Sequence, residues 1–206
     1  VRLAAIFPTC LTFDERQALY RELEDIPGLG IPHVHLRADC GPDEIRYLAG
    51  RFGTEAFNIH PRLSSHPFGP IPAGFARNIY IENVDTAPED AELEGDGVLV
   101  PGGICPDFSH LENARLHGLS EYVSTVERQL DRFKIGCCHM SAVRVGVPNH
   151  WAGMWDHHEY ASLDDLRYLA AYRHRLPPEW ASLELENRSE ERRVGKACCT
   201  RRSTHY

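Results

Sequence analysis

Short apolar segments alternate with amphipathic segments along most of the chain. The apolar segments have the length and residue types of β-strands, whereas the amphipathic ones repeat their apolar positions with a helical period. Strands that alternate with helices form βαβ units, so this pattern predicts an α/β fold with a parallel sheet. The predicted strands are 3–7, 32–36, 56–60, 78–83, 97–107, 134–140 and 180–186, and the predicted helices are 14–26, 42–52, 119–133 and 163–174.

The number of predicted strands favours a closed barrel. Seven strands are one fewer than the eight of a (β/α)8 TIM barrel. We therefore expect a TIM barrel whose first βα unit lies before Val1. An open, doubly wound sheet is the alternative, but no Gly-x-Gly-x-x-Gly motif follows a predicted strand to support it.

The composition changes abruptly near the C-terminus. Residues 188–206 contain six basic and two acidic side chains, and the segment RSEERRVGKAC resembles a translated sequencing adaptor. We expect one TIM-barrel metalloenzyme domain over 1–187, followed by a non-native tail over 188–206. Without this tail the formal charge becomes −12, against −8 for the whole chain. Such an acidic domain disfavours broad, non-specific binding to nucleic acids.

Cysteine usage and hydropathy indicate which cellular compartment to expect and whether a membrane is an expected partner. Five of the seven cysteines lie before residue 188, and no Cys-x-x-Cys motif occurs. This pattern favours reduced thiols and a cytoplasmic protein over a disulfide framework. No apolar run approaches the ~20 residues of a membrane span, so a membrane is not an expected partner.

Residue types that bind metals recur where predicted strands end. The carboxyl ends of parallel strands surround one mouth of a barrel, so we expect these side chains to converge. Buried carboxylates and imidazoles are costly unless they are paired or coordinated, and a divalent cation would satisfy the whole cluster. The candidate metal ligands are His35, His60, Glu82, Asp107, His110, His139 and Glu186, together with Asp156 and His158 from a loop.

Taken singly, most of these residues have simpler interpretations. Asp107, in the stretch ICPDFSH, could cap a following helix, and an isolated histidine is usually a hydrogen-bonded core or rim residue. The recurrence at successive strand ends favours ligands instead. Glu184 points to the same side of the predicted strand as Glu186. We prefer Glu186 as the metal ligand because it lies nearer the carboxyl end of the strand. The histidines left unassigned are His33, His66, His117, His150, His157 and His174.

These motifs resemble the endonuclease IV family, within the xylose-isomerase-like TIM-barrel superfamily. The stretches FNIHP, IYIENVD, GICPDFSH, CCHMS, WDHHEY and LELEN are similar to its successive ligand-bearing strand ends, and HVHL matches by position. The resemblance implies that all nine candidates hold up to three Zn²⁺ or Mn²⁺ ions. The sugar isomerase and epimerase branch shares only Glu82, Asp107, His139 and Glu186, often with His110.

The resemblance implies a DNA-repair hydrolase that cleaves phosphodiester bonds in abasic-site DNA, with Glu82 and Glu186 as catalytic groups. One alternative is an isomerase or epimerase that acts on a small sugar or sugar phosphate with a single divalent metal. The acidic charge favours this alternative, as does the small number of basic candidates near the mouth, Arg37, Arg62 and Arg144. A further alternative is a non-catalytic barrel that only binds a metal or ligand.

Overall fold

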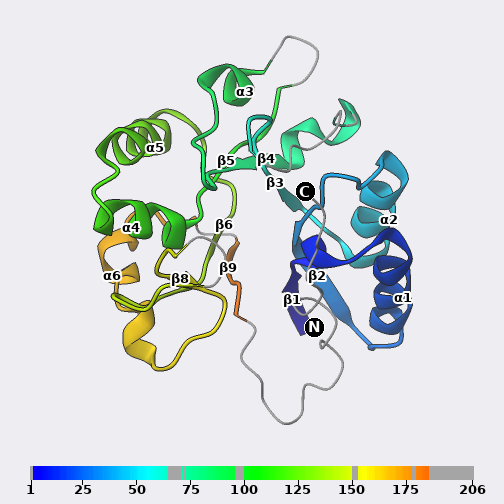
Figure 1. The fold of residues 1–206 in the computed structure, drawn as a ribbon. Coiled ribbons are helices and arrows are strands. Elements are labelled where there is room, and N and C mark those ends of the chain that lie inside the picture. Colours follow the sequence, from blue (N-terminus) through cyan, green and yellow to red (C-terminus); the bar gives the residue numbers. More distant parts are fainter. Residues whose placement is uncertain are drawn as a thin grey trace, which may run out of the picture.

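Five parallel strands form the main sheet of the molecule (Figure 1). The structure is a computed structural model that describes residues 2–64, 71, 73–95, 100–149, 153–177 and 180–185. Neighbouring strands in the sheet follow one another in the chain, so the predicted α/β fold with a parallel sheet is confirmed. The strands are β1 (Arg2–Ile6), β2 (Leu29–His35), β3 (Ala56–Ile59), β4 (Ile79–Glu82) and β5 (Gly103–Cys105).

Parallel pairing continues beyond β5. Isolated parallel bridges join Ile104 to Ile135 and Asp107 to His139. The next strand, β6 (Cys138–Met140), pairs in parallel with β9 (Ala181–Leu183). Every predicted strand region therefore contains a strand, although residues 96–99 lie outside the described part. No pairing among the described strands closes a barrel, so the TIM barrel stays a prediction.

Helices connect the strands and lie on their outer side (Figure 1). The Thr12 side chain and Glu15 form a capping box at the first helix, and Gly53, in the left-handed conformation, ends the second.

The predicted helix over 163–174 is instead broken into a 3₁₀ turn and one short helix. The helices are α1 (Phe13–Glu24), α2 (Pro42–Phe52), α3 (Asp90–Glu94), α4 (Phe108–Leu116), α5 (Ser120–Arg132) and α6 (Leu169–Tyr172), with 3₁₀ segments η1 (Pro8–Cys10), η2 (Ala73–Asn78) and η3 (Leu163–Leu166).

Helix α4 and the strands β7 (Ala142–Val143) and β8 (Asp156–His157) were not predicted from the alternation. Helix α4 begins directly after β5, where its first turn is capped by Asp107. Strands β7 and β8 form a small antiparallel pair. The pair places Asp156, one of the candidate ligands, opposite Val143.

The two faces of the parallel strands differ in polarity. Successive side chains of a strand point to opposite faces. One set of alternating positions, such as Val34, Phe57 and Ile81, belongs to the hydrophobic core that also contains helix residues. The opposite set carries polar residues, including His33, His35, Asn58, Glu82 and His139, all of which are buried.

A buried ion pair connects α1 to α2. The Arg16 side chain is fully buried, and its Nε and one terminal nitrogen donate to the two carboxylate oxygens of Glu44 at 2.6 and 3.0 Å. Tyr20 donates a further hydrogen bond of 2.8 Å to Glu44. The pair therefore fixes the packing of two helices against each other.

The described cysteines are all free thiols. Cys40, Cys105, Cys137 and Cys138 are buried, and Cys10 is exposed. Within the described residues, no helix is long and apolar enough to cross a lipid bilayer.

Candidate metal centre

The ligand-type residues converge at the carboxyl ends of the strands. Glu82 ends β4, and its Oε2 lies 2.9 Å from Nε2 of His139 and 3.4 Å from Nε2 of His35. Asn58 donates a hydrogen bond of 2.6 Å to the same oxygen. Three different strands thus direct their side chains at one carboxylate oxygen.

His139 lies among three carboxylates. Its Nδ1 is 3.1 Å from Glu184 Oε2 and 3.4 Å from Asp107 Oδ2, while its Nε2 faces Glu82. Burial opposes protonation of the ring, but Glu82 and Asp107 outweigh it and raise the pKa of His139 well above its ordinary value. Without a cation, His139 therefore carries a positive charge that offsets these carboxylates.

His35 is the neutral imidazole of the cluster. Burial lowers its pKa to about 3, against the smaller opposing effect of Glu82. Neither ring nitrogen of His35 has a hydrogen-bond partner, although both are buried. A buried imidazole whose two nitrogens make no hydrogen bond is costly unless it coordinates a cation, so this residue fits a metal ligand.

The two oxygens of Asp107 have different surroundings. Oδ1 accepts hydrogen bonds from the backbone N–H groups of Ser109 at 2.7 Å and His110 at 3.0 Å, which caps α4. Oδ2 instead faces His110 Nε2 at 3.5 Å and His139 Nδ1 at 3.4 Å. Asp107 is therefore both a helix cap and a member of the cluster.

The remaining candidates surround this centre. His110 Nδ1 lies 3.5 Å from Asp156 Oδ2, and His158 Nε2 lies 4.0 Å from Glu184 Oε1. The ring of His60 packs at 4.9 Å, edge to face, against that of His35. The structure thus brings together His35, His60, Glu82, Asp107, His110, His139, Asp156 and His158.

The geometry of the donor atoms fits divalent cations. Zinc–ligand distances of about 2.0–2.2 Å in a tetrahedral site separate neighbouring ligand atoms by about 3.3–3.6 Å. Several nitrogen–oxygen contacts of the cluster are 3.4–3.5 Å long. Three overlapping groups could each hold an ion: His35, His139 and Glu184; His35, His60 and Glu82; and Glu82, Asp107 and His110.

One predicted ligand, Glu186, lies outside the described residues. Glu184 occupies the cluster, although the sequence favoured Glu186. The register explains its place, because β9 sets Ser182 beside His139 and Glu184 follows on the same face. The opposite effects of burial and His139 leave the pKa of Glu184 lowered to about 2, so it is ionised.

Sequence reasoning also missed two buried polar residues beside the cluster, Asn58 and His33. Asn58 is flanked by hydrophobic residues in β3 and carries no charge, so its type gave no signal. Strand alternation places both on the same face as the candidate ligands, since Asn58 precedes His60 and His33 precedes His35 by two positions, but it does not reveal their partners.

Comparisons with known proteins add no family assignment. No protein-family model matches the chain, and no curated protein matches it either.

Proposed function

We propose that this protein is a hydrolase of phosphodiester bonds with a multinuclear metal centre, of the kind that the endonuclease IV resemblance implies for abasic-site DNA. The observation that carries the proposal is the overlap of the three donor groups. Glu82 belongs to two of them, and its carboxylate has two oxygens that could each bind one of two neighbouring cations. A carboxylate in this position suits a hydrolytic site in which two or three cations lie about 3.5–4 Å apart.

The proposal includes a (β/α)8 barrel as the scaffold. Its support is the parallel pairing in chain order, the polar inner set of side chains and the helices on the outer side (Figure 1). A hydrogen bond of 2.8 Å between His33 of β2 and Ser182 of β9 adds to it. This contact brings the last described strand close to one of the first.

The residues of the centre have distinct proposed roles. Bound Zn²⁺ or Mn²⁺ would neutralise a phosphate and lower the pKa of a bound water. Glu82, whose side chain is 2% exposed, is the shared inner carboxylate. Glu184, whose side chain is 12% exposed, is better placed to orient the attacking water. Phe7 packs against His35 and His139 and limits access of solvent to their rings.

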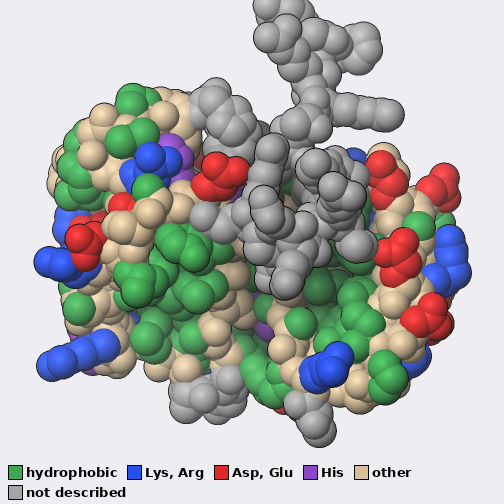
Figure 2. Space-filling model, turned by 90° about the horizontal axis from the view of Figure 1, so that it is seen from below, with side chains coloured by type: hydrophobic (Ala, Val, Ile, Leu, Met, Phe, Trp, Pro, Cys, Tyr) green, Lys and Arg blue, Asp and Glu red, His purple; other side chains and the backbone are tan. Residues whose placement is uncertain are grey.

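A second candidate function is isomerisation or epimerisation of a small sugar or sugar phosphate with one metal. It is favoured by the compact arrangement of Glu82, Asp107 and Glu184 around His139. Two carboxylates on either side of a substrate could move a proton between adjacent carbons. On the face shown in Figure 2, the visible Lys and Arg side chains lie apart from one another near the edge of the molecule.

Metal content and cleavage distinguish the two functions. We expect elemental analysis to give two to three ions per chain and an abasic-site duplex to be cleaved at low salt. EDTA should abolish cleavage, and Zn²⁺ or Mn²⁺ should restore it. One ion per chain without cleavage of the duplex would contradict the proposal and favour the isomerase.

A matched pair of histidine variants controls this experiment. His60→Ala should lower the metal content by about one ion, because His60 belongs to one of the donor groups. His157→Ala should leave it unchanged, since the His157 ring bonds to the backbone oxygen of Val147 instead. Equal metal content in both variants would exclude His60 as a ligand.

A further inference from the structure

A chain of buried polar side chains lies directly beneath the metal centre. The Nδ1 atom of His33 is 2.8 Å from the hydroxyl of Ser182, and its Nε2 is 3.0 Å from Oδ1 of Asn58. The amide nitrogen of Asn58 then contacts Oε2 of Glu82 at 2.6 Å. Each of these four residues is at most 9% exposed, so solvent cannot replace their contacts.

The direction of every hydrogen bond follows from Glu82. An ionised carboxylate only accepts, so Asn58 must present its NH₂ group to Glu82 and its carbonyl oxygen to His33. That oxygen also only accepts, so Nε2 of His33 carries the proton. Nδ1 is then free to accept from Ser182. One neutral tautomer of His33 therefore satisfies all the hydrogen bonds that link Ser182, His33, Asn58 and Glu82.

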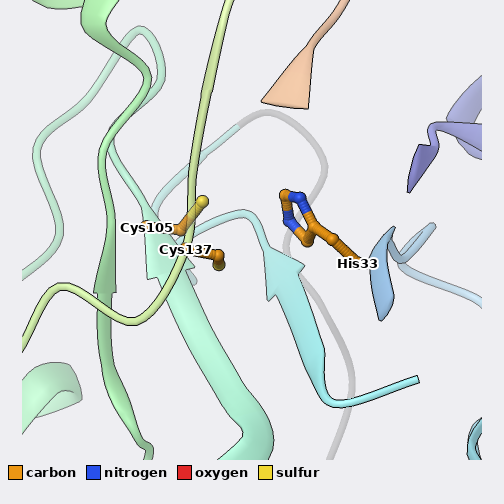
Figure 3. A group of neighbouring side chains, drawn as sticks. All are labelled: His33, Cys105 and Cys137. Atoms are coloured by element: carbon orange, nitrogen blue, oxygen red, sulfur yellow. The ribbon is translucent and has the colours of Figure 1, made fainter. Parts of the chain in front are cut away.

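The same histidine lies near two thiols. Figure 3 shows the His33 ring directed toward Cys105 and Cys137, and the three ligand atoms lie within 4.8 Å of one another. Burial raises the pKa of both thiols, so they remain neutral. Because both ring nitrogens of His33 are occupied by Asn58 and Ser182, a hydrogen-bonding role accounts for the histidine more fully than coordination by this trio.

We propose that His33 is a positioning residue, which acts through Asn58 to hold the shared carboxylate of Glu82 in place for the cations. Its hydrogen bond to Ser182 also holds β9 in place, and β9 is the strand that leads to Glu184. The inference rests on the proposed metal centre. Outer hydrogen-bond partners of metal ligands typically contribute about 10–100-fold to metal affinity.

Three variants test this series of hydrogen bonds. The measured quantity is the affinity for Zn²⁺, determined in competition with a chelating dye. His33→Phe keeps a buried ring but donates nothing to Asn58, and should weaken the tightest Zn²⁺ site about 10–100-fold. His33→Gln can both donate and accept, and should recover most of the affinity. Ser182→Ala, which removes only the far end of the chain, should have a smaller effect in the same direction. His157→Phe is the matched control and should leave the affinity unchanged.

Stoichiometry separates positioning from coordination. We expect His33→Phe to bind as many ions as the unaltered chain, only more weakly. An unchanged affinity in folded His33→Phe would overturn the proposal. Loss of one whole ion, reproduced by Cys105→Ser, would also overturn it, because His33 would then be a ligand of the thiol group.

A measurement without metal distinguishes this proposal from the proposed function. Nitrogen NMR of the EDTA-treated protein should show His33 protonated at Nε2 alone, and Asn58→Leu should remove that preference. If the unaltered protein binds no Zn²⁺, the proposed function fails whatever the tautomer. If it binds Zn²⁺ but His33 shows the other tautomer, the positioning proposal alone fails.

Discussion

At the scale of single residues, Asp107 has two separable roles, because each carboxylate oxygen has its own partners. We predict that Asp107→Asn retains the cap of α4, since asparagine is as good an N-cap as aspartate. The charged oxygen directed at His110 and His139 is lost, so affinity for Zn²⁺ should fall by at least tenfold. Dye competition measures the affinity, and urea unfolding of the metal-free protein measures the stability.

Asp107→Ala provides the comparison. It loses the cap as well as the charged oxygen that faces His110 and His139, and the metal-free protein should be about 1 kcal/mol less stable than Asp107→Asn. If both substitutions destabilise the metal-free protein equally, the cap contributes nothing. If Asp107→Asn binds Zn²⁺ normally, Asp107 is not a ligand.

His35 should dominate the acid sensitivity of the metal-free protein between pH 6.5 and 4.5. Its folded-state pKa of about 3 is below the ordinary value of 6.5, so in this range only the unfolded state takes up the proton. Stability is therefore retained above pH 6.5 and lost as the pH falls. The loss between pH 7 and 4.5 should be about 2–3 kcal/mol, from urea unfolding after EDTA treatment. His139, with a raised pKa, contributes no loss in this range.

His35→Gln should flatten this profile. The substituted side chain does not titrate, so the slope between pH 6.5 and 4.5 should largely disappear. A variant whose stability still falls as steeply would show that the acid sensitivity comes from another group.

At the scale of elements, the buried pair of Arg16 and Glu44 should determine how firmly α1 is held against α2. Glu44→Gln removes the charge that compensates a fully buried guanidinium, leaving only the half-exposed Asp39 nearby. Breaking such a pair costs about 3–5 kcal/mol. Urea unfolding should show a loss of this size, while Zn²⁺ affinity should not change.

The double variant Arg16→Met with Glu44→Gln tests the cause. It removes the unpaired cation, and the amide introduced by Glu44→Gln still offers an acceptor to Tyr20. The double variant should be more stable than Glu44→Gln alone. A double variant that is less stable would mean that Arg16 acts mainly through its packing.

The elements also show where sequence patterns were sufficient. Short apolar segments located every parallel strand, and the helical period gave α1, α2 and α5 within two residues. The segment over 163–174 has helical apolar spacing, but Ser162 and Asp165 form a capping box that begins a 3₁₀ turn, and the helix resumes only at Leu169. Local hydrogen bonding outweighed periodicity there.

The candidate site was less fully predictable from the sequence, because part of it depends on contacts between residues far apart in the chain. Charged and imidazole side chains at strand ends are visible in a sequence, so nine candidate ligands could be named, and the structure describes eight of them. The choice between Glu184 and Glu186 depends on strand register, which β9 sets by pairing with β6. His33 and Asn58 derive their meaning from partners 149 and 24 residues away in the chain, which no local pattern contains.

At the scale of the whole molecule, the centre joins two groups of strands that pair separately. His35 and Glu82 come from the five-stranded sheet, whereas His139 and Glu184 come from β6 and the end of β9. Only two isolated bridges connect these groups through the backbone among the described residues. A cation held by ligands from both groups should therefore stabilise the entire fold rather than one loop.

Thermal unfolding tests this consequence. At a free Zn²⁺ concentration about a hundredfold above Kd, binding to the folded state adds about 2.7 kcal/mol. For a chain of this size, that corresponds to an increase in Tm of about 5–10 °C, which EDTA should reverse in a single cooperative transition. Asp107→Asn, with weaker binding, should show a smaller increase at the same Zn²⁺ concentration, whereas His157→Ala should match the unaltered chain. If unfolding occurs in two separate transitions and Zn²⁺ raises the Tm of only one of them, the two strand groups fold independently. The cation is then not bound by ligands from both groups.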